Sequence, residues 1–184
     1  MRLVRTVRGI LEDRGVRYVL IGAHAAAFYG VIRSTRDIDL FTVDGSVLNA
    51  DVWSEADAHV TILTGDVFDP LAGTVRLIRD REQVDVVVGK WKFELAIIER
   101  SESRPFDDAM ILVPRPADVI LLKIAAGGPQ DMWDIHELLQ YVDRESVMAE
   151  VDAEVGALPS DARVLWKRVR AELSGGGPND SGVR

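Results

Sequence analysis

The stretch that decides the fold of this 184-residue chain is Val19–Thr42, VLIGAHAAAFYGVIRSTRDIDLFT. It opens with an apolar run typical of a strand, turns at Gly22 into an alanine-rich segment typical of a helix, and ends in the run Asp37–Phe41. Side chains of a strand alternate between its two faces, so Asp37 and Asp39 share one face. Two carboxylates on one face repel each other, and a divalent cation between them removes that repulsion. Oxygen ligands of this kind suit Mg²⁺ that also carries phosphates, so the stretch predicts a magnesium site.

The composition is that of an ordinary globular protein. Hydrophobic residues make up 47% and charged residues 28%, and the formal net charge is −8. A net-acidic chain lacks the field that concentrates nucleic acid around basic binders, which disfavours a non-specific DNA binder but not an enzyme that holds a nucleic-acid end locally. There are no cysteines, which excludes disulfides and thiolate metal sites. No apolar run approaches the roughly 20 residues of a membrane span, so we expect no membrane partner and a cytoplasmic protein.

We expect an α/β (α+β) fold, with a mixed sheet of about four or five strands flanked by helices and followed by a helical C-terminal part. We expect a core over residues 1–116, a helical region over 117–173 that completes a cleft, and a glycine-rich disordered tail over 174–184. The segment 104–108 is predicted to be a polar loop. Predicted strands span 16–21, 37–43, 59–63, 74–78, 83–89 and 110–113; predicted helices span 3–11, 24–29, 47–56, 92–100, 117–126, 130–142, 144–155 and 161–173.

Asp85 interrupts a run of β-branched residues, Val84–Val88. An unpaired carboxylate in an apolar strand costs several kcal/mol of desolvation unless a cation or donors meet it. One interpretation is an edge-strand acid that faces water. The other, which we favour, is a third ligand beside Asp37 and Asp39, because parallel pairing of the two strands would bring all three to one rim of the sheet.

Lys123 is the one charged residue in an otherwise apolar helical segment, Val119–Ala126. It is either a lysine whose stem lies along apolar surface while its amine reaches water, or a buried cation held for an anion such as a triphosphate. Asp131 begins the next predicted helix, where it is either a capping residue or a functional acid.

These residues together resemble a known family. Gly22-Ala23, followed at a distance by Asp37-Ile38-Asp39, resembles the signature of the polymerase-β-like nucleotidyltransferase superfamily. The fuller string LIGAHAAAFYGVIRSTRDIDLF, residues 20–41, looks most like a small bacterial branch that includes the AbiE-type abortive-infection toxins. The later string LLKIAAGGPQDMWDI, residues 121–135, is similar to the second signature of that branch. The resemblance covers roughly residues 1–142.

The resemblance implies a role for each matching carboxylate. Asp37 and Asp39 would hold two Mg²⁺ ions across the triphosphate and the attacking oxygen. Asp85 would share the metal on the acceptor side and help to deprotonate the acceptor hydroxyl. Together with Lys123, these three make up the implied catalytic set.

The resemblance also implies a nucleotide site. Gly22 and Ala23 would bring the backbone at a helix start close to the phosphates. Lys123 would neutralise the β,γ-phosphates, and Arg33 would do so from the loop after the predicted helix 24–29. Asp131 would complete the site, with Asp134 as the competing choice.

Three functional hypotheses follow from the resemblance. The first is a toxin-type enzyme that moves NMP from an NTP to a hydroxyl of a tRNA 3′ end or of a protein, with a cognate antitoxin as a further partner. The second is an antibiotic nucleotidyltransferase that acts on an aminoglycoside or a lincosamide. The third is a non-catalytic nucleotide-binding or antitoxin module. Phosphatase or nuclease chemistry is weaker, since neither needs the Gly22 helix start or Lys123.

Overall fold

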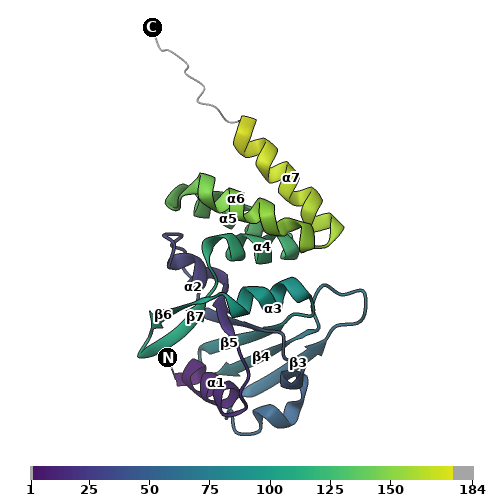
Figure 1. Ribbon diagram of the computed structural model, residues 1–184. Coiled ribbons are helices and arrows are strands. Elements are labelled where there is room, and N and C mark those ends of the chain that lie inside the picture. Colours follow the sequence, from purple (N-terminus) through teal and green to yellow (C-terminus); the bar gives the residue numbers. More distant parts are fainter. Residues whose placement is uncertain (1, 176–184) are drawn as a thin grey trace.

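The structure, a computed structural model, describes residues 2–175, with side chains described to residue 173. A five-stranded mixed sheet forms one layer, and the C-terminal helices form a second layer that lies beside it in Figure 1. This arrangement confirms the predicted α+β fold with a helical C-terminal part. No helix of the described residues is long and apolar enough to cross a membrane.

The sheet has the order β1-β2-β5-β4-β3. β2 and β5 run parallel, and the other three neighbouring pairs are antiparallel. The strands are β1 (Val19–Ile21), β2 (Asp37–Thr42), β3 (His59–Thr64), β4 (Gly73–Arg79) and β5 (Glu82–Val88). The pairing register places one row of side chains across all five strands, and that row is Ile21, Asp39, Asp85, Arg76 and Thr61.

One face of the sheet is closed by helix α1 (Arg2–Asp13). The apolar stripe of α1 packs against strand residues such as Leu40 and Val86, which are fully buried. Each such side chain contributes about 1.5–3 kcal/mol on burial, so this face is the main core of the sheet layer. The opposite face is only partly covered by helix α3 (Lys92–Glu99), whose Ile98 packs with Val19 and Phe41, while most of β3 stays exposed or half-buried. The row that contains Asp39 lies on this open face.

The helical layer consists of α4 (Pro116–Ala126), α5 (Pro129–Tyr141), α6 (Arg144–Glu154) and α7 (Ser160–Gly175), with the short helix η3 (Val155–Ala157) before α7. These helices share an apolar core that also includes residues of α3 and of helix α2 (Gly22–Ala27). Asp118 of α4 is fully buried and binds Arg100, at the end of α3, with Nη2–Oδ1 at 2.5 Å. This ion pair and the shared core fix α4 against the sheet layer.

Two local predictions were wrong. The segment 47–56 is not one helix but contains parts of two short 3₁₀ turns, η1 (Gly45–Leu48) and η2 (Ala50–Trp53), because Asp44 and Asn49 each accept a hydrogen bond from the backbone two residues on. The segment 104–108 is not a loop: β6 (Glu102–Phe106) pairs with β7 (Ala109–Val113) in a separate hairpin. Most of β6 is exposed, so it lacks the apolar alternation that marks a strand.

The predicted tail also begins too early. Residues 174 and 175 still belong to α7, so the helix continues past the last apolar residue of its stripe. The remainder of the predicted tail, 176–184, lies outside the described residues.

Candidate active site

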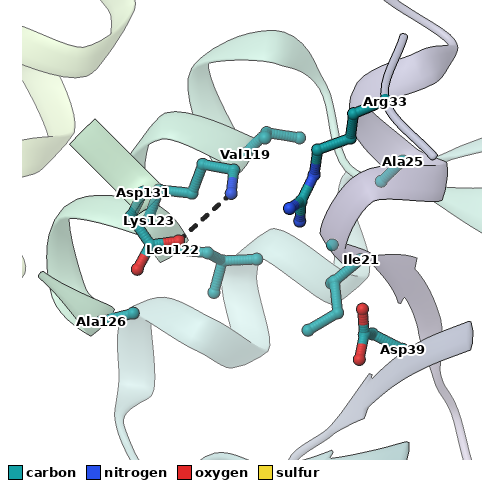
Figure 2. Close-up of a pocket in the computed structure, with 10 residues that line it drawn as sticks. Ile21, Ala25, Arg33, Asp39, Val119, Leu122, Lys123, Ala126 and Asp131 are labelled. Carbon is teal, nitrogen blue, oxygen red and sulfur yellow. Dashed lines mark hydrogen bonds and ion pairs between the residues drawn. The ribbon is translucent and has the colours of Figure 1, made fainter. Parts of the chain in front are cut away.

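A cleft of about 230 Å³ lies between the β1–α2 turn and helix α4. Figure 2 shows Lys123 and Asp131 on one wall of the cleft, with Arg33 and Asp39 on the other side. Both layers of the fold therefore contribute charged groups to it. Its lining comprises Ile21, Gly22, Ala25, Arg33, Asp39, Val119, Leu122, Lys123, Ala126 and Asp131.

Gly22 lies directly against a carboxylate of the cleft. Its φ is +65°, and a Cβ at this position would lie 2.1 Å from Oδ2 of Asp39. Both the left-handed backbone and the close approach of Asp39 disfavour any residue with a side chain here. Its neighbour Ala23 is 3% exposed and does not line the cleft, so only its backbone could serve the predicted phosphate contact.

The two carboxylates of β2 share one face, as predicted. Asp37 is exposed and Asp39 is half-buried, while Ile38 and Leu40 between and after them are buried in the core. Burial raises the pKa of Asp39 to about 6, with further contributions from the negative charges of Asp85 and Asp37. The positive charges of Arg33 and Lys123 act in the opposite sense. The ionised form of Asp39 is thus disfavoured, first by burial and then by the neighbouring carboxylates.

Asp85 lies beside Asp39 at the paired position of the parallel strand, as the sequence predicted. Its oxygens, however, are bound by Arg76 of β4, with Nε–Oδ1 and Nη2–Oδ2 both at 2.8 Å. Gln83 also donates to Oδ2, at 3.1 Å. The donors that a carboxylate in an apolar strand requires are therefore present within the chain. Sequence reasoning missed Arg76, because only the β4–β5 register brings it opposite Asp85.

The donor set fits a divalent cation in part. Asp37 and Asp39 supply hard oxygen ligands on one face. The pKa of Asp39 is raised chiefly by burial and further by the charges of Asp85 and Asp37, and a cation would relieve that repulsion. Asp85 is held by Arg76 in this arrangement. Within residues 2–173, no three acidic, histidine or cysteine side chains gather closely enough to hold a metal. The convergence of all three aspartates on shared magnesium stays a prediction.

Lys123 is a buried cation, 8% exposed, rather than a lysine that reaches water. Its Nζ lies 2.5 Å from Oδ2 of Asp134 and 3.2 Å from Oδ1 of Asp131. Asp134 is 1% exposed, and the Nε of Arg33 lies 3.8 Å from its Oδ1. Asp131 also accepts a hydrogen bond from the backbone N–H of Gly128, so it caps α5 as well as pairing with Lys123. The structure thus brings both competing acids to the same lysine.

A second cavity, of about 170 Å³, lies along the open face of the sheet. It shares Asp39 with the first cleft and extends over β5, β4 and β3. Its other lining residues are Thr61, Leu63, Thr74, Arg76, Asp85 and Val87. Asp39 therefore stands between two spaces, one bordered by a buried lysine and one bordered by the Arg76–Asp85 pair.

The mixed sheet, the paired carboxylates on one strand, the glycine turn against them and the helical layer across the cleft agree with the class of nucleotidyltransferases. The chain belongs to the family described as "Nucleotidyl transferase of unknown function (DUF2204)", whose profile matches residues 1–171. It is therefore an enzyme of the transferase class. No curated protein matches the chain in sequence.

Three solved structures are similar to this chain at low identity. ANT(2″)-Ia in complex with adenylyl-2″-tobramycin is 14% identical, with a TM-score of 0.53 over 93% of this chain and 97% of the other. The lincosamide antibiotic adenylyltransferase LnuA, lincomycin-bound, is 15% identical, with a TM-score of 0.49 over 77% and 97%. JHP933 from Helicobacter pylori is 14% identical, with a TM-score of 0.45 over 95% and 93%. At such identities the likeness to ANT(2″)-Ia concerns the fold alone.

Proposed function

We propose that this nucleotidyltransferase moves NMP from an NTP to the hydroxyl of a tRNA 3′ end or of a protein, as the toxin of an AbiE-like toxin–antitoxin or abortive-infection system. The observation that carries the transfer is that Asp39 borders two cavities at once. An in-line displacement needs its leaving group and its nucleophile on opposite sides of the reacting phosphorus. Two cavities that share one carboxylate offer such an arrangement.

The first cleft is the proposed nucleotide site. Lys123 and Arg33 supply positive charge for the β,γ-phosphates, and Asp131 and Asp134 hold the lysine in place. Gly22 permits a close approach to the backbone beside Asp39, where Ala23 offers its N–H. Arg33 is exposed and can turn toward a bound triphosphate, whereas Lys123 is buried on the wall of the cleft.

The second cavity is the proposed acceptor site. Asp85 borders it, and as a carboxylate it can accept the proton of an acceptor hydroxyl once it is free of Arg76. Asp37 and Asp39 would hold Mg²⁺, with Asp85 as the further ligand on the acceptor side. Two Mg²⁺ ions so held would stabilise charge on both the attacking and the leaving oxygen.

The test is transfer of label from each α-³²P-NTP, with Mg²⁺, to total tRNA and to cell-extract protein. We expect one NTP to label an RNA or protein band, and Asp39→Asn to abolish the labelling. Asp51→Asn, an exposed acid of η2, is the matched control and should label as the unmodified chain does.

Further arms of the same assay separate the competing hypotheses. Label on tobramycin or lincomycin, with none on macromolecules, would replace the toxin proposal by an antibiotic-modifying one. Binding of NTP in calorimetry without transfer to any acceptor would favour a non-catalytic module. Cytoplasmic residence and a cognate antitoxin belong to the proposal and are tested by fractionation and by rescue of growth with a co-transcribed neighbour.

A further inference from the structure

Arg76 and Asp85 form a cross-strand ion pair on the open face of the sheet. The two residues are register partners in β4 and β5, and the guanidinium meets the carboxylate with two bonds of 2.8 Å each. Planar two-bond pairs of this kind are the strong form of a charged hydrogen bond. The Asp85 side chain is 15% exposed and the Arg76 side chain 54% exposed, so the arginine has space to leave.

This pair conflicts with the metal role proposed for Asp85. Each oxygen of Asp85 already accepts at least one hydrogen bond, and Oδ2 accepts a second from Gln83. A divalent cation and a guanidinium seek the same lone pairs of a carboxylate. Asp85 can therefore bind only one of them at full strength at a time.

We propose that Arg76 is a positioning residue that acts as an internal counter-ion of Asp85. A divalent cation must displace the Arg76 guanidinium from Asp85 before the acceptor side of the site is complete. The guanidinium supplies the positive charge that the neighbouring carboxylates Asp39 and Asp85 need while no cation is bound. Arg76 then sets the metal concentration at which Asp85 becomes available. This inference rests on the proposed function, because it assumes that Asp85 takes part in metal binding.

Unequal metal binding follows from this arrangement. No ion pair or side-chain hydrogen bond within the described part of the chain holds the carboxylate of Asp37 or of Asp39, so the first cation should bind there. Binding that involves Asp85 has to break two charged hydrogen bonds. The second cation should therefore bind more weakly than the first, and the difference should depend on Arg76.

The test is titration with Mn²⁺ alone, followed by electron paramagnetic resonance of the free ion, on the full chain without NTP or acceptor. For Arg76→Gln we expect the weaker Mn²⁺ site to tighten about tenfold, the size set by loss of one bidentate charged pair. Arg79→Gln is the matched control: it lies on the same strand, three residues away and so on the other face, and should bind as the unmodified chain does. Arg76→Gln combined with Asp85→Asn should lose the gain.

Unchanged or weaker Mn²⁺ binding by a folded Arg76→Gln protein would overturn the proposal, since Arg76 would then only buttress Asp85. Far-ultraviolet circular dichroism establishes that the variant is folded. Arg76→Lys keeps the positive charge but cannot make two parallel hydrogen bonds to Asp85. Its weaker Mn²⁺ site should have an affinity between those of the unmodified chain and of Arg76→Gln. This variant replaces Arg76→Gln in the test if the glutamine variant does not fold. Tighter Mn²⁺ binding by Arg76→Gln, with no NMP transfer by the unmodified chain, supports this inference and rejects the proposed function. NMP transfer by the unmodified chain, with unchanged Mn²⁺ binding by Arg76→Gln, supports the proposed function and rejects this inference.

Discussion

Gly22 of the β1–α2 turn and Asp39 of β2 are packed so closely that a single methyl group would displace the carboxylate: a Cβ on residue 22 would lie 2.1 Å from Oδ2 of Asp39. The contact exists because β1 and β2 are antiparallel neighbours in which Ile21 pairs with Asp39. The glycine therefore serves the position of the carboxylate as well as the turn.

For Gly22→Ala we expect loss of at least about 1–3 kcal/mol of folding stability, because the residue has a positive φ and no space for a side chain. NMP transfer should fall with it, since Asp39 has to move. Urea unfolding and the labelled-NTP assay measure the two effects. Gly9→Ala is the control: nothing lies within 4 Å of its added Cβ, and alanine should stabilise α1 by about 0.5–1 kcal/mol. A Gly22→Ala protein as stable and active as the unmodified chain would contradict this contact.

Lys123 should be needed both for the folding stability of the chain and for NTP binding. Lys123→Met leaves Asp134, 1% exposed, without its nearest cation, and we expect a loss of about 3–5 kcal/mol in urea unfolding. Asp134→Asn in the same chain removes the unpaired charge and should recover most of that stability. The double variant should still fail to bind NTP in calorimetry. Recovery of NTP binding together with stability would show that Lys123 has no contact with the phosphates.

Asp39 should make stability fall as the pH rises. Its pKa is about 6 in the folded chain against an ordinary value of 3.8, so between these values the folded state binds more protons than the unfolded state. Above pH 6 the ionised carboxylate then costs roughly 2–3 kcal/mol. In EDTA, Asp39→Asn should exceed the unmodified chain in stability by that amount at pH 7 and by little at pH 4. Urea unfolding at the two pH values measures the difference in stability between Asp39→Asn and the unmodified chain. An equal difference at pH 4 and pH 7 would show that the pKa of Asp39 is not raised in the folded chain.

Asp118 should act on the fold and not on the metal. It is 0% exposed and pairs with Arg100 and Arg115. The pair with Arg100 joins α4 to the end of α3, and Arg115 precedes α4 directly. Asp118→Asn leaves two guanidiniums without their shared partner, and we expect a loss of about 2–4 kcal/mol in thermal unfolding. Mn²⁺ affinity should be unchanged, because no ligand of the proposed metal site contacts residue 118. A change in Mn²⁺ affinity larger than twofold would contradict this separation.

The main elements of the fold, and several of its site residues, could be predicted from local patterns. Alternation with period two placed Asp37 and Asp39 on one face and their apolar neighbours in the core. The apolar helix interrupted by Lys123 left two interpretations open, and the structure decides for the buried cation. Both patterns are local because the repeats of a strand and of a helix are set within a few residues. The short turns in 47–56 and the exposed strand β6 escaped prediction because side-chain caps and hairpin pairing overrode weak periodicity.

Only the tertiary structure decided which charges meet. The sequence by itself contained three aspartates, a lysine and a glycine turn in a particular order. The β4–β5 register brought Arg76 to Asp85, the α4–α5 packing brought Asp134 to Lys123, and the β1–β2 register brought Gly22 to Asp39. Each of these contacts joins different elements of the fold, and a pairing register depends on the fit of whole strands rather than on the residues that meet.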